Sequence, residues 1–222
     1  MSHLTGNTIF LALGASRLPS SQPILWLKAL VSIVAFWLGC LTFSKSRHFH
    51  PQRKATLSVS FLFQSIFIFV AASLAQTAVV PAFSWSLLGS PGHNEDAREA
   101  EENNNIILLP LALLAFQFGG QIVTSRILGF NEVPTNVLTS VYCDLFSDPK
   151  LLAPLSKNPK RNRRLASVIL MVIGGIVGGW LQKSRAGMAS ALWIAGSIKF
   201  VLALAWIGWQ GRRVEVDEKA RS

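Results

Sequence analysis

One stretch of the sequence, residues 55–93, contains no Asp, Glu, Lys or Arg. Its first part, residues 57–80, is almost continuously apolar and exceeds the roughly 20 residues with which a helix crosses a bilayer. A helix in the core of a soluble domain is rarely this long and this free of charge. The stretch therefore predicts a transmembrane helix.

The same pattern recurs at residues 24–44, 106–125, 165–182 and 188–209. The composition agrees with it, because 14% of the residues are charged, whereas a soluble domain has about 25%. None of the five segments shows the alternation of a barrel strand. We therefore expect an all-α fold, a polytopic transmembrane helical bundle with five spans.

The basic residues predict how the bundle is oriented. If all five segments cross the membrane, most of the 21 Lys and Arg residues lie on one side. The positive-inside rule places that side, and the C-terminus with it, in the cytoplasm. The basic run at residues 157–164 ends where a span begins, so attraction to anionic lipid and control of topology explain it. No nucleic-acid partner is predicted.

Two similar short runs indicate an internal repeat. One begins at Thr5 and the other at Pro134, and each is followed by two predicted spans. A span also precedes the second run, which suggests a design of three helices plus three inverted helices, with the first helix missing here. We expect one membrane domain over residues 1–222, with repeat-like halves at about 1–90 and 106–222. An acidic, disordered loop is expected at 90–105.

The two runs supply most of a predicted substrate site. Broken helices at the interface of inverted repeats commonly bind solutes. The candidates are Thr5, Gly6, Asn7, Thr135 and Asn136, and Gly6 lets the backbone leave helical geometry. The alternative is that these residues form helix caps and turns at the membrane surface.

Lys199 is the remaining candidate, because it lies near the middle of the last predicted span, where a charge is costly. Substrate binding or proton coupling explains it. The structural alternative is a hydrogen bond to backbone carbonyls or to a carboxylate such as Glu132 or Asp144. Glutamines in the spans either line a polar path or bond between helices; they are Gln64, Gln76, Gln117 and Gln121.

Other chemistry finds little support in the sequence. Cys40 and Cys143 are far apart, and there is no phosphate-binding loop, nucleophile motif or pair of carboxylates within a span. No metal and no cofactor are predicted, and an enzyme is disfavoured.

Small residues in the 165–182 span allow another helix to approach closely. Packing within the monomer is the expected use, and a homo-oligomer is the alternative. The residues are Gly174, Gly175, Gly178 and Gly179.

Several motifs carry a resemblance that covers almost the whole chain. They are Leu4-Thr5-Gly6-Asn7-Thr8, Thr124-Ser125-Arg126, Glu132-Val133-Pro134-Thr135, Ser147-Asp148-Pro149, the basic run and the Gly-rich segment 174–180. In this series the chain resembles the YoaK-like family of membrane proteins of unknown function, especially its fungal branch. The resemblance implies a further hydrophobic helix before the Thr-Gly-Asn motif, which this sequence lacks, and it supplies no substrate or reaction.

Transport or channelling of a small solute is the leading functional hypothesis, with a site between the two Thr/Asn motifs and near Lys199. The alternative is a non-transporting membrane scaffold or assembly factor, and a membrane enzyme comes third.

Overall fold

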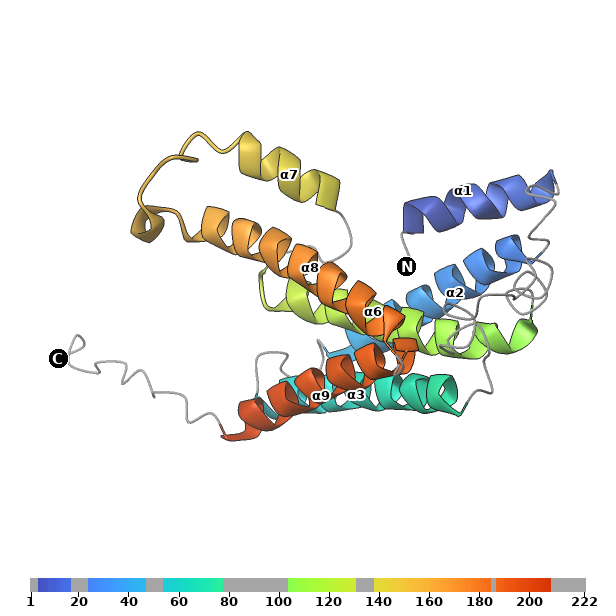
Figure 1. The fold of residues 1–222 in the computed structure, drawn as a ribbon. Helices are drawn as coiled ribbons and strands as arrows, with labels where there is room; N and C mark the ends of the chain where they lie inside the picture. The colour runs from blue at the N-terminus through green and yellow to red at the C-terminus, as the bar shows by residue number, and fades with distance from the viewer. Residues whose placement is uncertain are drawn as a thin grey trace.

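The computed structural model describes residues 4–16, 24–46, 54–77, 104–130, 138–184 and 187–208. All regular elements in these ranges are helical, which confirms the all-α class. The elements in chain order (Figure 1) are α1 (Leu4–Ala15), α2 (Leu25–Ser44), α3 (Lys54–Gln76), η3 (Asn105–Ile107), α6 (Leu108–Ile127), α7 (Leu138–Phe146), η4 (Leu155–Lys157), α8 (Pro159–Lys183) and α9 (Gly187–Gly208).

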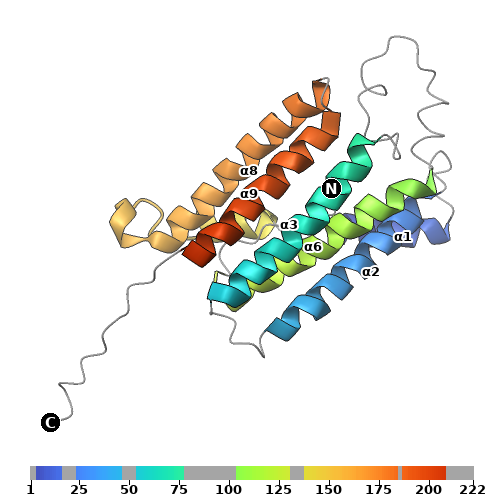
Figure 2. The same cartoon turned by 90° about the horizontal axis from the view of Figure 1, so that it is seen from below.

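Five helices, α2, α3, α6, α8 and α9, are long and apolar enough to cross a membrane. They run roughly along a common direction in Figure 2. Each corresponds to one predicted span, although its ends differ from the predicted ends. The acidic loop expected at 90–105 lies outside the described residues except for Asn104 and Asn105, where the Asn104 side chain accepts a hydrogen bond from the Ile106 N–H at 3.1 Å.

Two helix pairs form the core of the bundle. α3 packs on α9, α2 packs on α6, and a contact between α3 and α6 joins the pairs. The buried face of α3 is rich in small side chains, among which Ala71 and Ala72 are completely buried. Close packing of this kind holds helices together in lipid, where the hydrophobic effect between them is absent.

The α2–α6 contact is closest at two glycines. A Cβ on Gly39 would overlap the carbonyl oxygen of Phe116, and one on Gly119 would lie 2.6 Å from the carbonyl oxygen of Phe36. The two helices therefore meet backbone to backbone, and neither position has room for a side chain.

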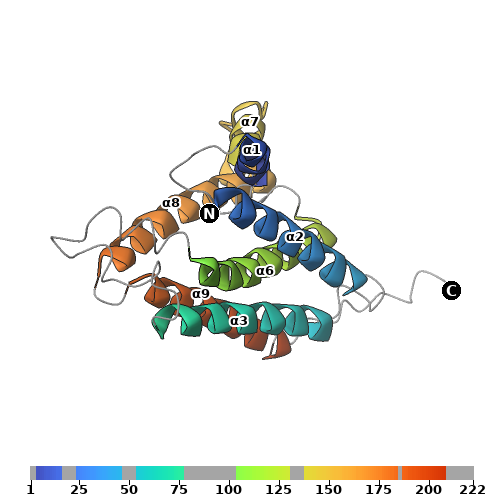
Figure 3. The ribbon, with the colours of Figure 1, turned by 90° about the vertical axis from the view of Figure 1, so that its right-hand side faces the viewer.

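Two helices are too short to cross the membrane. α1 has 12 residues and α7 has 9, which correspond to about 18 and 14 Å of helix, against a hydrocarbon core of about 30 Å. α1 packs on α2, and α7 packs on α8. Figures 1 and 3 show the two short helices along one line on the same side of the bundle, with their N-terminal ends facing each other.

α8 begins inside the basic run and not after it. Asn158 caps the helix by accepting a hydrogen bond from the Arg161 N–H at 3.1 Å, and Pro159 occupies the first turn. Proline suits this position because its missing N–H would have no partner there. The predicted start at residue 165 is wrong, because it rested on apolar length alone and ignored the cap.

Arg161 holds the loop between α7 and α8, residues 147–158. Its Nη1 donates to the carbonyl oxygens of Leu151 at 2.5 Å and Ala153 at 2.6 Å, and the residue is only 6% exposed. Asn158 Nδ2 donates to Asp148 Oδ2 at 2.9 Å, and this bond lowers the pKa of the Asp148 carboxyl from its ordinary value. Part of the basic run therefore organises the loop, a role that the sequence interpretation missed.

Replacing Arg161 with alanine is expected to open this loop. The Leu151 and Ala153 carbonyls would each lose a charged donor, at a cost of about 1–3 kcal/mol. Limited proteolysis with an enzyme that cuts after leucine should therefore cleave the variant within 147–158 faster than the wild type. Lys160→Ala is the control, since that side chain is exposed. Equal cleavage rates for Arg161→Ala and the control would contradict this role.

Candidate functional site

A buried polar centre lies where α3, α6 and α9 meet. Lys199 Nζ donates hydrogen bonds to Gln64 Oε1 at 2.8 Å and to Gln117 Oε1 at 2.6 Å. All three residues lie near the middle of their helices, and the two glutamines are 0% and 2% exposed. We call these three residues the Lys199 centre. It binds α9 to α3 and α6, the two helices that join the core pairs.

Hydroxyl groups orient one of the glutamines. Gln64 Nε2 donates to Ser60 Oγ at 3.2 Å, and the hydroxyls of Ser60 and Thr124 are 3.1 Å apart. Thr124 Oγ1 donates in turn to the carbonyl oxygen of Gly120 at 2.8 Å. Because the amide nitrogen of Gln64 is engaged by Ser60, its oxygen is directed at Lys199.

Asp144, one of the two predicted carboxylate partners of Lys199, does not belong to this centre. Asp144 lies exposed on α7, and its Oδ2 is 3.4 Å from Arg164 Nη2. α7 packs on α8 and not in the α3–α6–α9 junction, which explains the difference. Glu132 lies outside the described residues. Lys199 is held instead by neutral oxygens, those of Gln64 and Gln117.

The first Thr-Gly-Asn motif lies in the first turn of α1. Thr5 and Gly6 are helical, so the expected departure from helical geometry at Gly6 is wrong. Asn7 Nδ2 donates to Ser32 Oγ at 3.0 Å, and Ser32 is 1% exposed on α2. Asn7 therefore ties the short helix to a spanning helix.

Thr135 and Asn136 of the second motif lie outside the described residues. α7 begins shortly after them, at Leu138. The N-terminal ends of α1 and α7 face each other in Figures 1 and 3. Such N-terminal ends carry unpaired N–H groups and a partial positive charge.

The structure does not link Asn7 to the Lys199 centre. Asn7 bonds to α2, whereas Lys199 bonds to α3 and α6. The sequence interpretation singled out Lys199 but did not single out Gln64 and Gln117 as its partners. The available signal was their polarity within predicted spans, at Gln64 in 57–80 and Gln117 in 106–125. Gln76 has another role and accepts a hydrogen bond from Trp193 Nε1 at 2.8 Å.

A family model described as a protein of unknown function, DUF1275, matches residues 1–205. The chain belongs to the DUF1275 family. Searches of curated proteins and of solved structures found no match. The match spans both Thr/Asn motifs and Lys199, so all three belong to the part of the chain shared with the DUF1275 family.

The glycine-rich part of α8 lies open in this DUF1275 member. A Cβ added to Gly174, Gly175, Gly178 or Gly179 would meet no atom of the described chain within 4 Å. The packing within the monomer that was expected of these glycines is therefore absent from the helices described. The face is available to lipid or to another helix.

Proposed function

We propose that this DUF1275 member is a transporter or channel for a small solute, of the YoaK-like type and with an inverted-repeat design. The observation that carries the proposal is the pair of short helices, α1 and α7, whose N-terminal ends face each other (Figures 1 and 3). Neither is long enough to cross the membrane. In inverted-repeat transporters such discontinuous helices end near the bilayer midplane and form the solute site there.

The proposed site lies between these two ends. It is formed by Thr5, Gly6, Asn7, Thr135 and Asn136. Lys199 contributes positive charge from the core of the bundle. The C-terminus and the basic loops face the cytoplasm in this proposal, as the positive-inside rule favours.

The charges of the spanning helices favour an anionic solute. None of the five long helices contains Asp or Glu, whereas α9 contains Lys199 near its middle. The Lys199 charge is met by neutral amide oxygens, and the facing helix ends add partial positive charge. A small anion is stabilised in this field, and a cation is repelled.

Flux into liposomes that contain the purified protein tests the proposal, with chloride and acetate as anions, sodium as the cation and urea as the neutral solute. Asn7→Ala is expected to lower anion flux about tenfold, because a hydrogen bond to a charged ligand contributes about 1.5 kcal/mol or more. Asn105→Ala, at an exposed asparagine of η3, is the control and should leave the flux unchanged.

Each outcome of this assay separates one part of the proposal from the others. No flux of any solute contradicts transport itself. Flux of sodium or urea without anion flux contradicts the anionic class. Unchanged flux in Asn7→Ala removes Asn7 from the site.

One observation favours a second function, a non-transporting membrane scaffold. No residue in the apolar part of α8 is buried, and four glycines of this helix have no neighbouring helix against them in the described chain. Small-residue faces of this kind recruit other transmembrane helices, including those of a second copy. A scaffold gives no flux in the same liposomes, so the assay discriminates between the two functions.

A further inference from the structure

The loop between α7 and α8 presents both leucines and lysines on its surface. Leu152 is 97% exposed and Leu155 is 71% exposed. Lys150 and Lys157 are exposed in the same loop, and Lys160 is exposed in the first turn of α8. We call these five residues the Lys/Leu surface. Leucines exposed to this degree present apolar side chains that lipid can cover.

The positive charge of this surface is not cancelled by its neighbours. Two acidic residues lie nearby, and both are held by groups other than the three lysine side chains. The backbone N–H of Lys150 donates to Asp148 Oδ1 at 2.8 Å. Asp144 pairs with Arg164, and Asp148 accepts a hydrogen bond from Asn158 and lies 3.8 Å from Arg164. Within the described ranges the ion pairs leave out all three lysines of the surface.

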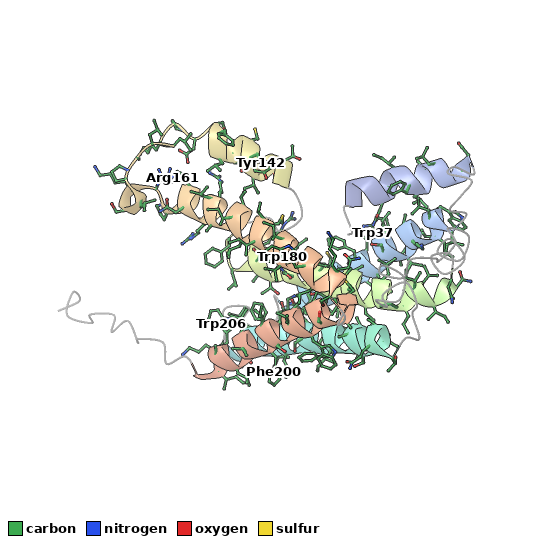
Figure 4. All side chains as sticks on the ribbon, in the orientation of Figure 1. Trp37, Tyr142, Arg161, Trp180, Phe200 and Trp206 are labelled. Atoms are coloured by element: carbon green, nitrogen blue, oxygen red, sulfur yellow. The ribbon has the colours of Figure 1, made fainter. Side chains whose placement is uncertain are left out.

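Hydrogen bonds from side chains of α8 hold the backbone of this loop. The carbonyl groups on either side of Leu152 accept hydrogen bonds from Arg161, and Asn162 Nδ2 donates to the carbonyl oxygen of Leu155 at 2.6 Å. Figure 4 shows Arg161 at the start of α8, beside this loop. With its backbone tied to α8, the loop keeps both leucines at the surface.

The position of the loop indicates what covers these leucines. The loop leads directly into α8, which is apolar from Leu165 onward, so the surface lies where a spanning helix leaves the membrane. At such a boundary leucines enter the upper acyl region while lysines remain at the level of the phosphates. We propose that the Lys/Leu surface binds the headgroups of anionic phospholipids of the surrounding bilayer. This inference does not depend on transport.

Binding of fluorescent phosphatidylserine to the full chain in neutral detergent is the first test. Removing the three charges in Lys150→Gln/Lys157→Gln/Lys160→Gln is expected to weaken binding by about tenfold or more, and phosphatidylcholine binding should not change. The matched control, Lys45→Gln/Arg126→Gln/Lys183→Gln, removes the same charge at three exposed positions elsewhere. A loss in the control as large as in the first variant, or no loss in either, overturns the proposal.

An environment-sensitive dye at position 152 tests the apolar part separately. The dye is attached to Leu152→Cys after Cys40 and Cys143 have been replaced. In vesicles that contain phosphatidylserine its emission should shift to the blue, and lipid-borne quenchers should reduce it. The three-lysine variant should reduce both effects. If the dye shows emission typical of water in the labelled protein that retains all three lysines, the proposal is overturned, whatever the binding assay gives.

Discussion

Gly39→Ala is expected to destabilise the protein by about 3 kcal/mol, the upper range for overpacking a close contact. The added methyl group would overlap the carbonyl oxygen of Phe116 on α6. Backbone cannot move aside as the end of a flexible side chain can, so α2 and α6 must separate along their whole contact. Unfolding in a titration from mild detergent to sodium dodecyl sulfate, followed by circular dichroism, measures the loss.

Gly174→Ala is the matched control for this prediction. It makes the same chemical change in another spanning helix, at a glycine with open space around it. The control should be as stable as the wild type or slightly more stable, since alanine favours a helix more than glycine does. Equal destabilisation by the two substitutions would contradict the close α2–α6 contact.

Lys199→Met is expected to reduce solute flux more than tenfold. It removes the only charge near the middle of α9 and leaves the amide oxygens of Gln64 and Gln117 without their donor. Each orphaned oxygen costs about 1–3 kcal/mol, so some loss of stability accompanies the loss of flux. Lys183→Met, at an exposed position at the end of α8, should affect neither quantity.

A triple variant separates a functional role of Lys199 from a structural one. Replacing the whole centre with apolar side chains, in Lys199→Met/Gln64→Leu/Gln117→Leu, removes the orphaned oxygens together with the charge. Stability should recover toward the wild-type value, as it does when buried polar groups are exchanged for apolar groups of similar shape. Flux should remain low. Recovery of flux together with stability would show that Lys199 only holds helices together.

The spans could be predicted because lipid imposes a simple condition on sequence. A helix in hydrocarbon needs about 20 uncharged residues whatever its neighbours are, so the five segments stood out. The ends of the helices obey local rules instead. α8 begins at Pro159 because Asn158 caps it, although four of its next five residues are basic.

The Lys199 centre was predictable only in part, because the sequence shows the lysine but not which helices pack around it. Lys199 stands out as a charge in an apolar segment, and composition alone finds it. Its partners depend on which helices meet, and close contacts such as that of Gly196 on α9 with Phe69 on α3 help to decide this. No periodicity in α3 or α6 indicates that Gln64 and Gln117 turn toward the same ammonium group.

The Lys199 centre has a consequence for the order in which the protein is assembled. Gln64 and Gln117 precede Lys199 along the chain, so the ribosome completes both acceptor helices before it makes the lysine helix. A lysine at the centre of an isolated helix enters the bilayer at a cost of about 3 kcal/mol on insertion scales. The amide oxygens of Gln64 and Gln117 are already present to accept hydrogen bonds from the Lys199 ammonium group of α9. The earlier helices therefore favour its entry into the membrane by removing part of this cost.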